Sequence, residues 1–162
     1  MLGLKGKRAI VTGGAWGIGQ AISLRLAREG VAVGILDLDQ AKADEISTQI
    51  TTDGGQATSE HCDISDYDRI KEAVLKIEER NGATDILVNN AGWDKAMKFL
   101  DSNPEFWRKV ININYYGLLN MSYIVAKGMV ERGGGRIINI SSDAGRVGSS
   151  GCLLYTSPSP RD

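Results

Sequence analysis

Short apolar runs alternate with longer amphipathic stretches along almost the whole of this 162-residue chain. In the longer stretches apolar residues recur every three or four positions, which is the spacing of one helix face. Strands that alternate with helices in this way form βαβ units with a parallel sheet. The sequence therefore predicts a doubly wound α/β fold in the order βαβαβαβαβ, with strands at 8–12, 31–36, 57–62, 85–88 and 137–140.

The sequence also marks where two helices begin. Ser65 and Asp68 are spaced as a capping pair for the third helix. Asn103 and Pro104 are a cap and a first-turn proline for a long helix that is expected to run to about Arg132. This helix has apolar residues on more than one face and should bury more than one side. A contact between subunits would supply the second cover, so the full-length protein is expected to be a homo-oligomer.

The composition argues against several classes of function. Hydrophobic residues make up 42% of the chain and charged residues 24%, as in a single globular domain with a buried core. A net charge of −1 without basic clusters argues against a nucleic-acid or membrane partner, and no apolar run has membrane-spanning length. Cys62 and Cys152 lack the spacing of a metal or disulfide site. No metal is expected, and a reducing, cytoplasmic location is the default.

A glycine-rich segment, TGGAWGIG at 12–19, lies between the first strand and the first helix. In that position Gly13 permits a tight turn, Gly17 lets the backbone approach a pyrophosphate, and Gly19 lets helix and strand pack closely. The start of the helix then offers free N–H groups and a partial positive charge to phosphate. The alternative is a plain glycine turn, which the strand–turn–helix context disfavours. The expected nucleotide contacts in this segment are Gly13, Ala15, Trp16, Gly17, Ile18 and Gly19.

Asp37, at the end of the second strand, favours NAD over NADP. A carboxylate there can accept hydrogen bonds from the ribose hydroxyls of adenosine, and it would repel a 2′-phosphate. The glycine-rich turn holds no Arg or Lys to attract such a phosphate, and Trp16 stands where a basic residue would be. The alternative is that Asp37 caps the next helix, but Asp39 is better placed for that role.

The end of the third strand carries His61 and Asp63. Asp63 is either a partner for the adenine edge or a loop carboxylate, and the pattern does not choose between them. His61 is the only histidine and is expected to be structural or exposed, since no Ser–His–Asp set or metal cluster can be assembled around it.

Over about residues 5–151 the chain resembles the short-chain dehydrogenase/reductase family. The matching motifs, in the family's order and spacing, are TGGAWGIG at 12–19, Asp37, CDI at 62–64, NNAG at 89–92, NINYYG at 112–117 and RIINISS at 136–142. The resemblance implies a Rossmann-like sheet with strand order 3-2-1-4-5-6-7, of which this chain holds the N-terminal five-strand portion. It also implies an oxidoreductase that uses NAD and a small-molecule substrate.

The resemblance assigns roles to further positions. Asp63 and Ile64 would lie beside the cofactor, Asn89 would brace the sheet, and Asn114 would hold a water molecule in a proton relay. Ser142 would polarise the substrate oxygen, which a hydroxyl can do by donating to a developing alkoxide. From the residues alone Ser142 is a loop serine. Cofactor contacts are also implied for Asn90, Ala91 and Gly92.

Two segments, NNAGWD at 89–94 and SDAGRVGSSG at 142–151, resemble the branch of the family that contains 2-hydroxycyclohexanecarboxyl-CoA dehydrogenase. The 3-oxoacyl-carrier-protein reductases are close relatives of this branch. A secondary alcohol or ketone, such as a hydroxyacyl-CoA, is the implied substrate. Lys95 and Lys98 could meet CoA phosphates, although surface lysines near a loop usually do nothing specific.

The family pairs a catalytic Tyr with a Lys four residues later. Tyr155 lies 13 residues after Ser142, as the family spacing requires, but position 159 is Ser. A Tyr has an ordinary pKa of about 10, and without a nearby cation it stays protonated at neutral pH. Pro158 and Pro160 also break the helix that would carry both residues.

We therefore expect an incomplete NAD-binding domain at 1–151 and a non-native or disordered tail at 152–162, joined to a C-terminally truncated frame. Such a fragment would hold nucleotide without turnover, and its fifth strand would be an uncovered edge.

Overall fold

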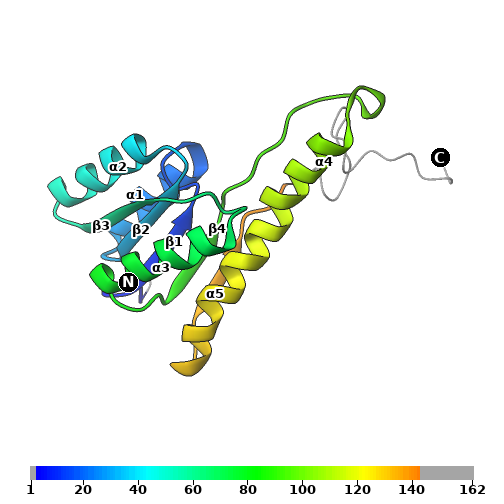
Figure 1. Cartoon of the computed structure of the whole chain (residues 1–162). Helices are drawn as coiled ribbons and strands as arrows, with labels where there is room; N and C mark the ends of the chain where they lie inside the picture. The colour runs from blue at the N-terminus through cyan, green and yellow to red at the C-terminus, as the bar shows by residue number, and fades with distance from the viewer. Residues whose placement is uncertain (1–2, 143–162) are drawn as a thin grey trace.

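The computed structural model describes residues 3–142. Five parallel strands form one sheet in the order β3-β2-β1-β4-β5, with β1 at its centre (Figure 1). The elements in chain order are β1 (Arg8–Thr12), α1 (Gly17–Arg28), β2 (Ala32–Asp37), α2 (Gln40–Thr52), β3 (Gln56–His61), α3 (Tyr67–Asn81), β4 (Ile86–Asn89), the short 3-10 helix η1 (Phe99–Asp101), α4 (Pro104–Ile111), the π-helix η2 (Asn112–Gly117), α5 (Leu118–Glu131) and β5 (Arg136–Asn139). The predicted Rossmann-like α/β fold is confirmed, and each strand boundary agrees with the prediction to within one residue.

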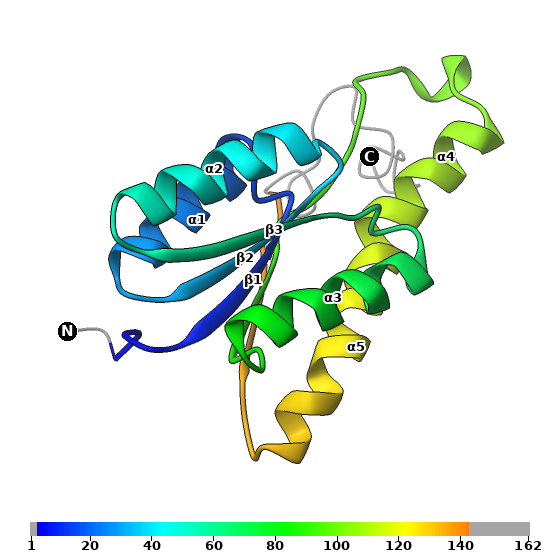
Figure 2. The ribbon, with the colours of Figure 1, turned by 60° about the vertical axis from the view of Figure 1, so that its left-hand side comes forward.

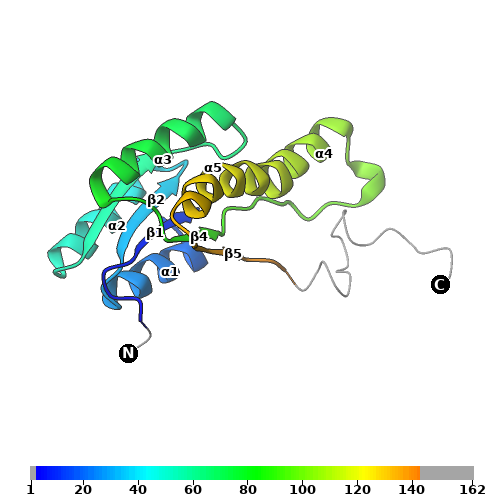
Figure 3. The same cartoon turned by 90° about the horizontal axis from the view of Figure 1, so that it is seen from below.

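Helices cover both faces of the sheet (Figure 3). The side chains of β1 alternate between the two cores: Ala9 and Val11 pack on the side of α1 and α2, and Ile10 packs on the side of α3 and α5. β2 contributes Gly34, where an added Cβ would lie 2.5 Å from a methyl carbon of Ile77. Helix α3 can therefore approach the sheet closely only because this strand position lacks a side chain.

Helix α1 ends as the sequence predicts, at a glycine. Gly30 adopts a left-handed φ of 80°, its N–H donates to Ala27 O, and the N–H of Val31 donates to Leu26 O. This pair of bonds satisfies carbonyls that the helix leaves open. α2 ends in the same way at Gly54 and α5 at Gly133.

The predicted cap of α3 is wrong. Asp66 is the N-cap, and its carboxylate accepts hydrogen bonds from the backbone N–H groups of Asp68 and Arg69. Ser65 instead donates its hydroxyl to Asp63. The helix starts one residue later than the Ser65–Asp68 spacing requires, because Asp66 offers a charged acceptor at the position where the chain turns.

The long helix is present from residue 104 to 131 as α4, η2 and α5 in succession. Asn103 caps it by accepting from the N–H of Phe106, and Pro104 lies in its first turn, as predicted. Apolar side chains lie on more than one face, but only the sheet side is buried within the described chain, as at Met121 and Val125. The outer apolar residues are exposed: Tyr115, Tyr116, Leu119, Tyr123 and Val130. Burial of a second side by a subunit contact stays a prediction. In Figure 1 this helix extends well beyond the sheet, with α4 farthest out.

The fifth strand is an edge within the described residues. β5 pairs with β4 alone, and all four of its residues are exposed. Ile137 and Ile138 lie at this edge with 39% and 45% of their surface accessible. In residues 3–142, no helix is both long and apolar enough to cross a lipid bilayer.

Candidate functional site

A groove of about 610 Å³ opens at the carboxyl ends of the strands. Its walls are the turns that follow β1, β2, β3 and β4, closed on one side by α4 and η2. The strand order reverses direction between β1 and β4. The groove lies at this point, beyond the carboxyl ends of the strands, which is the usual ligand site of such sheets. The lining residues are Gly13, Trp16, Asp37, Leu38, Cys62, Asp63, Ile64, Asn90, Ala91, Gly92, Trp93, Lys109 and Ile113.

The glycine-rich turn has the geometry that its residue types require. Gly13 and Gly17 have left-handed φ values of 60° and 51°, which glycine adopts without strain. A Cβ on Gly17 would meet nothing within 4 Å, whereas one on Gly19 would lie 1.9 Å from the carbonyl oxygen of Gly13. Gly17 thus presents backbone to open space, and Gly19 allows the helix to lie against the turn.

The start of α1 is open to an anion. Trp16 is the N-cap and makes no side-chain cap hydrogen bond, and no acidic residue lies in the first turn. N–H groups at a helix start that lack intrahelical acceptors attract phosphate, assisted by the helix dipole. Ile18 and Gly17 lie in this first turn, next to the groove rather than among its lining residues.

Asp37 joins the turn to β2. Its Oδ2 accepts from the N–H of Ala15 at 3.0 Å and its Oδ1 accepts from the N–H of Asp39 at 3.1 Å. Ala15 itself is fully buried. An ionised carboxylate has about four acceptor sites, so two remain for ribose hydroxyls. Asp39 caps α2 by accepting from the N–H of Lys42, as the sequence suggested, which leaves Asp37 for another partner.

Four hydrogen bonds connect the turns after β1 and β4. The side-chain amide of Asn90 donates to the carbonyl oxygens of Thr12 and Gly13, at 3.0 and 3.1 Å. In return Thr12 Oγ1 accepts from the N–H groups of Asn90 and Ala91, both at 3.0 Å. Asn89, one residue earlier, is buried and donates to Asn139 of β5 and to Ser122 of α5. Asn89 thus braces the sheet, as the resemblance implied.

The turn after β3 contributes Asp63 and a buried thiol. Asp63 Oδ1 accepts from both the N–H and the hydroxyl of Ser65, so this carboxylate shapes its own loop while it lines the groove. Burial raises the pKa of the Cys62 thiol to about 12, which keeps it protonated. His61 is exposed. In residues 3–142 no group of His, Cys, Asp and Glu is placed to hold a metal ion.

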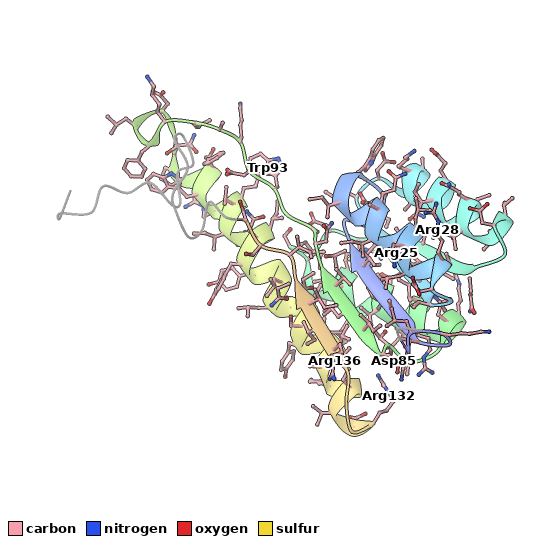
Figure 4. All side chains as sticks on the ribbon, turned by 180° about the vertical axis from the view of Figure 1, so that it is seen from behind. Arg25, Arg28, Asp85, Trp93, Arg132 and Arg136 are labelled. Carbon is pink, nitrogen blue, oxygen red and sulfur yellow. The ribbon has the colours of Figure 1, made fainter. Side chains whose placement is uncertain are left out.

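Asn114 lies in the π-helix, and its side chain makes two hydrogen bonds to the backbone of the loop that follows β4. Its Oδ1 accepts from the N–H of Trp93 at 2.7 Å and its Nδ2 donates to the carbonyl oxygen of Trp93 at 2.8 Å. Trp93, labelled in Figure 4 where this loop leaves the sheet, packs its ring against Phe106, and Lys109 Nζ lies 4.0 Å from the ring centroid. The side-chain amide of Asn114 is thus used in positioning this loop, and π-helical turns frequently occur at functional sites.

The remaining predicted residues lie near or outside the groove. Ser142 is exposed and follows β5, so it lies at the carboxyl ends of the parallel strands, as the groove does. Lys95 and Lys98 are exposed and do not line the groove. Tyr155 lies outside the described residues. Sequence reasoning missed five lining residues: Leu38, Cys62, Trp93, Lys109 and Ile113. Lys109 and Ile113 share one signal, a spacing of about one helical turn.

Comparison with known proteins agrees with this geometry. An acetoacetyl-CoA reductase of Shinella zoogloeoides is 39% identical over 154 residues, which is 95% of this chain and 62% of that protein. The 3-oxoacyl-acyl-carrier-protein reductase FabG of Thermotoga maritima is 34% identical over 94% of this chain and 62% of its own length. A 2,3-dihydro-2,3-dihydroxybenzoate dehydrogenase of Bacillus subtilis is 32% identical over 96% of this chain and 59% of its own length.

The chain thus spans about three-fifths of the length of these relatives. The family model described as short chain dehydrogenase matches residues 7–158, which include every turn that lines the groove. The chain belongs to the short-chain dehydrogenase family.

Proposed function

We propose that this protein binds NAD(H) in the groove, and that the complete protein is an NAD-dependent oxidoreductase for a secondary alcohol or ketone. The observation that supports this most is Asp37: a carboxylate with unused acceptor sites, hydrogen-bonded to the glycine-rich turn that precedes the open start of α1. Phosphates would lie against the first turn of α1, and Asp37 would hold the adenosine ribose. Its negative charge disfavours a 2′-phosphate.

The other lining residues fit the rest of such a cofactor. The groove lining includes one carboxylate and two apolar side chains whose chemistry suits adenine: Asp63, Ile64 and Ile113. Asn90, Ala91 and Gly92 would lie along the cofactor beyond β4. The contacts proposed for the glycine-rich turn are Gly13, Trp16, Gly17, Ile18 and Gly19, with the buried Ala15 acting through Asp37. When bound, the nicotinamide supplies the hydride acceptor or donor.

The proton side of the reaction would use Ser142 and the region of Asn114. Ser142 would donate its hydroxyl to the substrate oxygen. The Asn114 amide accepts one hydrogen bond from the Trp93 backbone and donates one to it, which leaves it one N–H and one acceptor site for a water molecule. Tyr155 matches the acid/base position by spacing only, and Ser159 provides no cation to lower its pKa. We propose that this chain binds nucleotide without turnover.

The substrate class that the relatives support is a hydroxyacyl or oxoacyl thioester. Two of them are named for acetoacetyl-CoA and for 3-oxoacyl groups on acyl carrier protein. A 2-hydroxycyclohexanecarboxyl-CoA is our finer proposal, from the NNAGWD segment, and a 3-oxoacyl-carrier-protein reductase is the alternative. The exposed apolar side of α5 supports assembly of the complete protein into a homo-oligomer.

Titration calorimetry with NADH, followed by an assay for NADH formation from NAD with 3-hydroxybutyryl-CoA and 2-hydroxycyclohexanecarboxyl-CoA, tests both parts. We expect NADH to bind with a measurable heat and neither thioester to be oxidised. Failure of folded protein to bind NADH would contradict the cofactor assignment. Clear turnover would contradict the proposal that Ser159 leaves this chain inactive.

A further inference from the structure

Trp16 joins the glycine-rich turn to the start of α2. It lines the groove with 56% of its surface accessible. Its indole Nε1 donates to Asp39 Oδ2 at 3.3 Å, and Asp39 in turn caps α2 and donates its own N–H to Asp37. The ring is therefore held beside the carboxylate that would bind the adenosine ribose. Helices α1 and α2, which carry the two sides of this contact, lie next to each other on one face of the sheet (Figure 2).

A cation lies on the ring of Trp16. Lys42 Nζ is 5.0 Å from the ring centroid and 2.6 Å from Glu45 Oε1. The Lys42 side chain is only 19% exposed, and Lys42 is not among the groove-lining residues of the described chain. Both its contacts are of weak kinds: a cation–π contact near the surface and an ion pair with an exposed carboxylate. The ammonium group is thus near the ribose end of the groove but is held in other contacts.

We infer that the contacts with Trp16 and Glu45 keep the Lys42 ammonium group away from the adenosine ribose, an arrangement called here the mask of Lys42. This mask, in addition to Asp37, would select against a 2′-phosphate on that ribose. The inference rests on the proposed nucleotide function of the groove. Asp37 repels a 2′-phosphate directly. A freed Lys42 would oppose this repulsion, since its backbone N–H already bonds Asp39, two residues from Asp37, and its flexible side chain starts from that point. Trp16 is then a specificity-determining residue.

Two nucleotide fragments that differ only in the 2′-phosphate isolate this effect: 5′-AMP and adenosine 2′,5′-bisphosphate, titrated by calorimetry at low salt. We expect the wild-type chain to bind 5′-AMP more tightly. In the double variant Trp16→Ala/Glu45→Gln, affinity for the bisphosphate relative to 5′-AMP should rise about tenfold, equivalent to about 1.4 kcal/mol. Adding Lys42→Gln should cancel that gain. Asp37 is unchanged throughout, and the part of the gain that Lys42→Gln cancels reports Lys42.

Glu29→Gln is a matched control, because Glu29 forms a comparable exposed pair with Arg25 on α1. It should leave the ratio of the two affinities unchanged. The Glu45 side chain is 64% exposed, so Glu45→Gln should leave folding unchanged. Alone, it should move the ratio in the same direction by a smaller factor. An unchanged ratio in the double variant, or a gain that survives Lys42→Gln, would overturn the mask. Wild-type protein that binds neither fragment would instead overturn the proposed nucleotide function.

Discussion

Replacing Gly19 by alanine should damage the glycine-rich turn even though alanine is the better helix former. A Cβ at this position would lie 1.9 Å from the Gly13 carbonyl oxygen and 2.5 Å from Asn90 Nδ2. The Gly13 oxygen would have to move by about 1 Å to reach the closest contact that side chains tolerate, and it would then lose its hydrogen bond from Asn90.

The energies can be compared directly. Overpacking of this kind costs about 1–3 kcal/mol, and the lost hydrogen bond costs about 1 kcal/mol more. The helix preference of alanine over glycine offsets about 1 kcal/mol. The free energy of unfolding of Gly19→Ala should therefore fall by about 1–3 kcal/mol, and NADH binding should weaken at least about tenfold because the phosphate-binding amides shift with the turn.

Urea unfolding and calorimetry with NADH measure the two effects. Gly133→Ala is the matched control: Gly133 has a left-handed φ of 82° and no atom near its Cβ position, far from the groove. It should lose about 1 kcal/mol of stability through backbone strain and keep wild-type affinity for NADH. If Gly19→Ala retained both wild-type stability and wild-type affinity, neither property would depend on the close approach of helix and turn.

Three further predictions concern other parts of the fold. The Arg8 guanidinium holds the pKa of Asp85 below its usual value. The stabilisation is therefore present above the unfolded pKa of about 3.9 and is lost as pH falls through the lower folded value. Between about pH 5 and pH 2, the free energy of unfolding in urea should fall more steeply with pH for wild type than for Asp85→Asn, and equal slopes would contradict this. Asn114→Ala removes both hydrogen bonds to the Trp93 backbone, so it should lower the free energy of unfolding by about 1–3 kcal/mol and weaken NADH binding. A variant with wild-type stability and affinity would show that these hydrogen bonds do not position the loop. Burial raises the pKa of Cys62 to about 12, so iodoacetamide at pH 8 should label it, as followed by peptide mass, only after denaturation; rapid labelling in folded protein would contradict its burial.

The fold could be predicted from the sequence because each of its signals is local. β4 is apolar at every position before Asn89, and Gly30 follows the last turn of α1, so alternation and turn residues were sufficient. The cap role of Asp39 could also be predicted, because Asp39 precedes a helix whereas Asp37 ends a strand. Such features depend on neighbours in the chain.

The errors and omissions involve competition or distance. Ser65, Asp66 and Asp68 all can cap a helix, and only the path of the chain after β3 selects Asp66. The π-helix has the same apolar spacing as an α-helix. The contact that accompanies it is the hydrogen bonding of Asn114 to Trp93, which is 21 residues away in the chain. No periodicity in the sequence reports a contact of that kind.

The central claim is that the Asp37 carboxylate beside the glycine-rich turn selects NAD. Calorimetry with NADH and NADPH on the wild type and on Asp37→Asn tests it most directly. Wild type should bind NADH more tightly than NADPH. Asp37→Asn should lose about 1.5–3 kcal/mol of NADH binding free energy, and its preference for NADH over NADPH should become smaller. A wild type that prefers NADPH, or an Asn variant with an unchanged preference, would contradict it.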